Sequence, residues 1–161
     1  AMNPRIAHHF RSILLTFFFL ITGSFAVTAV HRFSVVFVPS LDFTVLGTAA
    51  DPAAFVAEYM AKHPTAIWWA IFAHAFGAFV AVFLTTQFTK VGIWKEGPTR
   101  KSFYPALIVS WFYLIAVYLN TQTVPTGMEW LAVDLALTAV ASAFAFKFGG
   151  GLRLIEPGKV K

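Results

Sequence analysis

The sequence predicts an all-α polytopic membrane protein, a four-transmembrane-helix bundle with a short external amphipathic helix. Apolar residues make up 58% of the 161 residues and charged residues only 12%, against roughly 45–50% and 25% in soluble domains. Four segments are long and apolar enough to cross a bilayer, which takes about 20 residues. An open sheet would leave backbone groups unpaired in hydrocarbon, so these segments should be helices of one membrane domain, 1–161.

The first span should cover residues 12–30. Arg5 and Arg11 precede it, and Val27-Thr28-Ala29 resembles a secretory cleavage site. The apolar run is long for a signal peptide, so we expect it to be retained as a span. The remaining spans are predicted at 65–88, 103–119 and 128–146.

The basic residues predict which side of the membrane each end faces. In a four-span chain, only Arg32 and Lys62 of the 12 Lys and Arg residues fall on one side. The other ten fall on the side of the termini: Arg5, Arg11, Lys90, Lys95, Arg100, Lys101, Lys147, Arg153, Lys159 and Lys161. Because cytoplasmic segments are enriched in Lys and Arg, both termini should be cytoplasmic, in a bacterial inner membrane. The same rule accounts for the net charge of +5 without nucleic acid.

The connection 31–64 should lie outside. Its first part is apolar and β-branched, and is expected to extend the first helix or to lie against the membrane surface. Asp51-Pro52 then gives an N-cap acid followed by proline at the first helical position. Residues 51–63 therefore predict a short amphipathic helix on the bundle or in the interface, which Pro64 ends.

Small residues recur at spacings of three and four on two spans. Helices in lipid associate through such residues, so these faces should meet a neighbouring helix. Either the contact lies within the bundle, or it is a dimerisation or docking face for membrane-protein partners. The residues are Ala70, Ala73, Gly77 and Ala81 on the second span, and Ala132, Ala136, Ala139 and Ala143 on the fourth.

An ionisable side chain inside the membrane is costly and by default suggests function. His74 and Asp134 are such residues, and both fall in the outer half of their spans. Asn120, His31 and Arg32 end the third and first spans at the same side. The sequence thus predicts a polar cluster, either a structural hydrogen-bond network or a proton relay, ligand site or ion site.

No cofactor or metal is predicted. The chain has no cysteine, so disulfides and thiolate ligands are excluded. A haem with two histidine ligands would need His31 and His74 at one depth, and we expect His31 at the interface instead. Ala70 and His74 have the Ala-x-x-x-His spacing of pigment-binding helices, but the pattern is weak in an alanine-rich segment.

Several short motifs are spread over residues 12–148. They are Asp51-Pro52, Pro64, His74-Ala75-Phe76-Gly77, and the pair Trp130 and Asp134, together with Pro39 and Asn120. In these the chain resembles a loose group of small, uncharacterised bacterial four-span membrane proteins. It departs from the group at Ala81, where glycine is common. The resemblance implies the topology above and no catalytic role.

No nucleophile motif surrounds the polar residues, so the sequence predicts a protein more suited to association than to catalysis. The leading interpretation is a non-catalytic accessory or structural subunit of a larger membrane complex, or a homo-oligomer. One alternative is a pigment- or haem-binding subunit using His74. Another is a small transporter or channel with Asp134 in the path.

Overall fold

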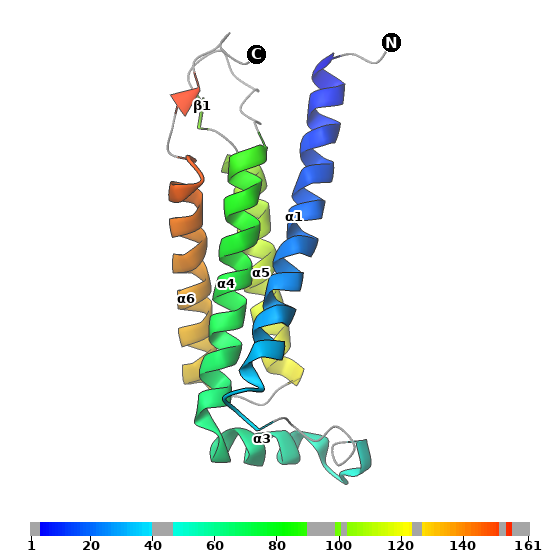
Figure 1. The fold of residues 1–161 in the computed structure, drawn as a ribbon, viewed down its shortest axis with the longest axis vertical. Helices are drawn as coiled ribbons and strands as arrows, with labels where there is room; N and C mark the ends of the chain where they lie inside the picture. Colours follow the sequence, from blue (N-terminus) through cyan, green and yellow to red (C-terminus); the bar gives the residue numbers. More distant parts are fainter. Residues whose placement is uncertain are drawn as a thin grey trace.

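The computed structural model describes residues 4–39, 47–89, 99–100, 103–123, 127–151 and 154–155. Within them lie five helices: α1 (Pro4–Ser34), α3 (Pro52–Lys62), α4 (Pro64–Phe88), α5 (Phe103–Thr123) and α6 (Met128–Phe148). The four long helices are apolar enough to cross a membrane and form a bundle, with α3 lying across one end (Figure 1). The predicted helical fold with four spans and a short extra helix is confirmed.

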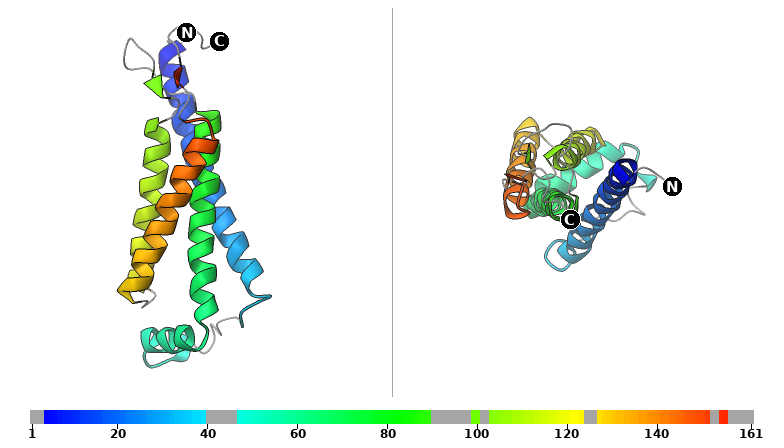
Figure 2. Two further views of the ribbon diagram at one scale, coloured as in Figure 1. Left: turned by 90° about the vertical axis from the view of Figure 1, so that its left-hand side faces the viewer. Right: turned by 90° about the horizontal axis from the view of Figure 1, so that it is seen from above.

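Helix α4 is the centre of the bundle and packs along α1, α5 and α6. Helix α1 crosses α4 obliquely and has little contact with α5 (Figure 2). Both α4 and α6 start at the α3 end and run away from it, so they are parallel neighbours (Figure 1). The core of the bundle is built from small and β-branched residues with one tyrosine: Ala78, Ala81, Val82, Ala106, Val109, Tyr113 and Ala145.

Two glycines let α1 and α4 cross at backbone distance. A Cβ atom added at Gly23 would lie 2.6 Å from the carbonyl oxygen of Gly77, and one added at Gly77 would lie 2.9 Å from that of Gly23. Such close approach of helix backbones is how membrane helices gain dispersion contacts without a hydrophobic driving force. The Tyr113 hydroxyl donates a hydrogen bond to the carbonyl of Leu20 at 3.3 Å, and this bond ties α5 to α1.

Helix α1 continues past the predicted span to Ser34, where a turn follows, so the first residues of the connection extend the helix, which is one of the two arrangements expected. This extension becomes important for the site. Helix α3 begins as predicted: Asp51 is its N-cap and accepts a hydrogen bond from the Ala54 amide at 3.0 Å, with proline at the first helical position. His63 alone separates α3 from α4.

The Tyr59 hydroxyl donates a hydrogen bond to the carbonyl of Pro39. This contact joins the middle of α3 to the segment that follows α1, and burial raises the pKa of the Tyr59 phenol. Helix α3 is thus attached to the bundle at both ends of the connection, through Pro39 and through His63.

A small antiparallel sheet was not predicted. Strands β1 (Thr99–Arg100) and β2 (Leu154–Ile155) pair beyond the ends of α4 and α6, at the end opposite α3. Several residues used for the topology prediction lie outside the described part of the chain: Lys90, Lys95, Lys101, Arg153, Lys159 and Lys161. The same holds for residues 40–46 of the apolar connection.

Candidate functional site: a polar pocket near the α3 end

The centre of the site is a contact between the two intramembrane ionisable residues. Nδ1 of His74, on α4, lies 2.7 Å from Oδ2 of Asp134, on α6. Only 14% of the His74 side chain and 8% of the Asp134 side chain are exposed. At that distance and burial, the hydrogen bond is short and shielded from competing water.

Both carboxylate oxygens of Asp134 have a partner. The Thr138 hydroxyl, one turn further along α6, donates to Oδ1 at 3.3 Å. Because an ionised carboxylate only accepts, Nδ1 of His74 carries the hydrogen of the pair when Asp134 is ionised. The imidazole then has one free edge, Nε2, which accepts a hydrogen bond when the ring is neutral and donates when it is a cation.

The pair lines a pocket of about 170 Å³ beneath α3. The lining comes from every helix of the described chain: His31 of α1, Met60 of α3, Ile67, Ala70, Ile71 and His74 of α4, Asn120 and Thr121 of α5, and Trp130 and Asp134 of α6. A pocket of this size holds several water molecules, at about 30 Å³ each. It is smaller than the roughly 300–1,000 Å³ of pockets for drug-sized ligands.

The expectation that His31 and His74 lie at different depths is wrong. Their ring centroids are 6.1 Å apart, and the rings meet edge to face. The reason is the length of α1: since the helix runs to Ser34, His31 lies about one turn inside its end rather than at the boundary.

Of the other residues in the predicted cluster, one lines the pocket and one does not. Asn120 lines the pocket with His31, His74 and Asp134. Both His31 and Arg32 are exposed. Only His31 lines the pocket, because the turn that directs His31 toward α4 directs the next residue elsewhere. The pocket thus gathers at least one polar residue from each of the four long helices.

The two small-residue stripes lie in different surroundings. On α4, Ala73, Gly77 and Ala81 are buried and Ala70 is half-buried, on the face where Gly77 meets Gly23. On α6, the four alanines of the stripe are all exposed: Ala132, Ala136, Ala139 and Ala143. The buried face of α6 is instead the one that carries Asp134, Thr138 and Ser142.

Sequence reasoning missed part of the lining. Met60 reaches the pocket from α3, and Trp130 packs edge to face on Trp68 at 5.4 Å between ring centroids. Neither residue carries a local signal for this role. The polar face of α6 could have been found from the sequence. Asp134, Thr138 and Ser142 are spaced by four residues, which places them on one side of a helix.

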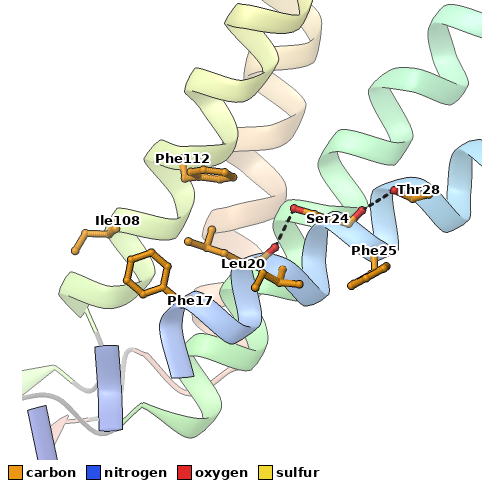
Figure 3. Close-up of a pocket in the computed structure, with 8 residues that line it drawn as sticks. Phe17, Leu20, Ser24, Phe25, Thr28, Ile108 and Phe112 are labelled. Atoms are coloured by element: carbon orange, nitrogen blue, oxygen red, sulfur yellow. Dashed lines mark hydrogen bonds between the residues drawn. The ribbon is translucent and has the colours of Figure 1, made fainter. Parts of the chain in front are cut away.

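A larger hollow lies between α1 and α5 (Figure 3). It measures about 520 Å³ and is lined mainly by apolar side chains: Phe17, Leu20, Ile21, Phe25, Ile108 and Phe112, with Ser24 and Thr28. Both hydroxyls donate to carbonyls of their own helix, Ser24 to Leu20 at 3.0 Å and Thr28 to Ser24 at 3.1 Å. The hollow is therefore an apolar groove suited to hydrocarbon, with no polar group directed to a ligand.

The dimensions of the polar pocket bear on the cofactor alternative. A space of about 170 Å³ does not accommodate a porphyrin or chlorin macrocycle between His31 and His74 without moving the helices apart. Nδ1 of His74 is already engaged by Asp134, so only Nε2 is available as a ligand atom. Within the described residues, no group of three or more His, Asp or Glu side chains is arranged to hold a metal ion.

Four long apolar helices around a buried ionisable pair define a multi-pass membrane protein. A comparison with protein-family models, curated proteins and solved structures finds no match for this chain. The similarity to small four-span proteins noted above therefore identifies no family.

Proposed function

We propose that this protein exchanges protons between the aqueous phase and the membrane interior, with Asp134 and His74 as the proton-binding groups of a small transporter. The observation that supports this proposal is the 2.7 Å contact between the two side chains at the floor of a polar pocket. An intramembrane carboxylate paired with a histidine is the arrangement that proton relays use, because either group can hold the proton.

An open aqueous channel fits less well than a proton relay. On the far side of the pocket, α4, α5 and α6 pack around Ala78, Ala81, Val109 and Ala145, all nearly or completely buried. A hydrated ion needs a continuous wide path, whereas a proton moves along hydrogen bonds between a few groups. The apolar core therefore favours transfer of protons alone.

Replacement of Asp134 by asparagine tests the proposal. Asparagine occupies the same space but does not titrate, so we expect proton flux to fall by about ten-fold or more. The measurement is the rate of pH change inside pyranine-loaded liposomes under a potassium diffusion potential. Glu129→Gln is the matched control, because Glu129 is an exposed acid on the same helix that does not line the pocket. Equal flux in Asp134→Asn and the unmodified protein contradicts the proposal, as does flux no faster than that of empty liposomes.

The orientation we propose places the α3 end outside and the other end of the bundle in the cytoplasm of a bacterial cell. The distribution of Lys and Arg supports it. Because the chain has no cysteine, single cysteines report the side directly. Ala61→Cys on the exposed face of α3 should react with an impermeant maleimide in intact cells, and Lys95→Cys should react only after lysis. The reverse pattern would invert the topology.

A second proposal is that the protein works as an accessory subunit of a larger complex or as a homo-oligomer. The exposed alanines of α6 support it, since a face of small residues that meets no helix within the described bundle suits a helix from elsewhere. The two proposals are compatible, because the α6 alanines lie on the side of the helix away from Asp134. A strictly monomeric, partnerless species after mild-detergent extraction from native membranes would contradict the second.

A further inference from the structure

Buried hydroxyl groups continue from the pocket along the contact between α4 and α6. On α6, Thr138 is fully buried and Ser142 nearly so. On α4, Thr85, Thr86 and Thr89 are fully buried. Burying these five hydroxyl groups between two helices costs free energy unless each of them is hydrogen-bonded.

These residues lie on the faces that the His74–Asp134 pair defines. Thr138 and Ser142 follow Asp134 at successive intervals of four residues, which keeps them on one side of α6. Thr85 follows His74 by about three helical turns and so returns to the same side of α4.

A second contact shows that the same faces still meet at the far end of the helices. A Cβ atom added at Gly149, just after α6, would lie 2.8 Å from the Cβ atom of Thr86. The two helices are thus in contact at His74–Asp134 and again at Thr86–Gly149. Ser142 and Thr85 lie in the stretch between these two contacts.

Two of the hydroxyls lack a partner and the others do not. Thr86 donates to the carbonyl of Val82 at 2.7 Å, and Thr89 donates to that of Thr85 at 2.6 Å. Thr85 Oγ1 and Ser142 Oγ have no hydrogen-bond partner among the described protein atoms. Buried polar atoms of this kind in proteins are usually satisfied by internal water.

We infer that internal water joins Thr138, Ser142 and Thr85 into a hydrogen-bonded line, along which protons pass between Asp134 and the end of α4. This inference rests on the proposed function and specifies its route. When Asp134 is protonated at Oδ1, the Thr138 hydroxyl turns from donating to this oxygen to accepting from it. The proton of Oδ1 then binds the Thr138 oxygen as the Thr138 hydrogen passes to the next oxygen of the line. Asp134 loses one O–H bond, each oxygen of the line gains one and loses one, and the water at the end of α4 gains one, so one proton is moved and no electrons are transferred.

The test compares neighbouring threonines in the same liposome assay. Thr85→Val and Ser142→Ala remove hydroxyls of the line, and each should lower proton flux by about ten-fold or more. Thr86→Val is the matched control: it removes an equally buried hydroxyl one residue away, whose bond is made within its own helix, and it should leave flux unchanged. Thr85→Ser retains the hydroxyl and should retain flux, which separates loss of the group from loss of folding.

The outcomes distinguish the route from the function. Normal flux in Thr85→Val and Ser142→Ala, with loss in Asp134→Asn, overturns the route and leaves the proposed function standing. Equal losses in Thr85→Val and Thr86→Val also overturn the route, because they point to a packing effect. Flux that none of the variants alters, Asp134→Asn included, overturns both.

Discussion

Gly77→Ala is expected to separate α1 from α4 and to destabilise the bundle by about 1–3 kcal/mol, the usual cost of overpacking. The added Cβ would fall 2.9 Å from the carbonyl oxygen of Gly23, which is backbone and has no rotamer to change. It would also meet the side chain of Val27. The measurement is the unfolding midpoint in mixed micelles of mild detergent and SDS, followed by circular dichroism.

Two further variants sharpen this prediction. Val27→Ala removes the side-chain part of the clash, so combining it with Gly77→Ala should recover some stability but not all, because the Gly23 carbonyl remains. Ala139→Leu enlarges a residue on the exposed face of α6 and should have little effect on the isolated protein. If Gly77→Ala unfolds at the midpoint of the unmodified protein, the backbone contact between α1 and α4 does not stabilise the fold.

The α1–α4 crossing also holds the site together. Among the described residues, His31 is the one that α1 contributes to the pocket, and its ring lies 6.1 Å from that of His74. Both His31 and Gly23 are on α1, so displacing the helix at Gly77 moves His31 away from the Asp134–His74 pair. A structural substitution at Gly77, three residues from His74 on α4, should therefore alter the pocket as well as the stability.

The spans could be predicted from the sequence because hydropathy and length are local properties. Segments such as 65–88 stay apolar for the full thickness of the bilayer, and no tertiary contact changes that. Helix ends are less local: nothing in the residues after Val30 stops a helix, and α1 continues to Ser34. The predicted span ended at Val30 and therefore placed His31 at the boundary, whereas in the structure His31 is one of the residues that line the pocket.

The rotation of each helix about its own axis was harder to predict from the sequence than the position of the spans. On α6 the sequence offered two faces, the alanines led by Ala136 and the polar residues led by Asp134. Alanine is tolerated both against lipid and against another helix, so its spacing does not select the buried side. A carboxylate is not tolerated in lipid, and this stronger energy turns Asp134, Thr138 and Ser142 toward α4.

Asp134→Ala is expected to destabilise the protein by about 2–3 kcal/mol, because it leaves the His74 imidazole buried without its partner. The membrane lowers this cost below that of a soluble protein, since the unfolded helices also find partners in lipid. His74→Ala should lower the stability of the protein by a similar amount. In the double variant the losses should not add, and the shortfall, about 1–2 kcal/mol, is the coupling energy of the pair.

The Glu58–Lys62 pair on α3 provides the control for this cycle. Its atoms lie 2.6 Å apart, as close as those of His74 and Asp134, but both side chains are exposed. Lys62 holds the pKa of Glu58 below its usual range, yet solvent screens the attraction, so the same cycle on α3 should give no measurable coupling. Equal coupling in the two pairs would mean that burial adds nothing to the His74–Asp134 contact. The pair would then be an interaction in a hydrated site, and its protons would exchange with bulk water without any relay.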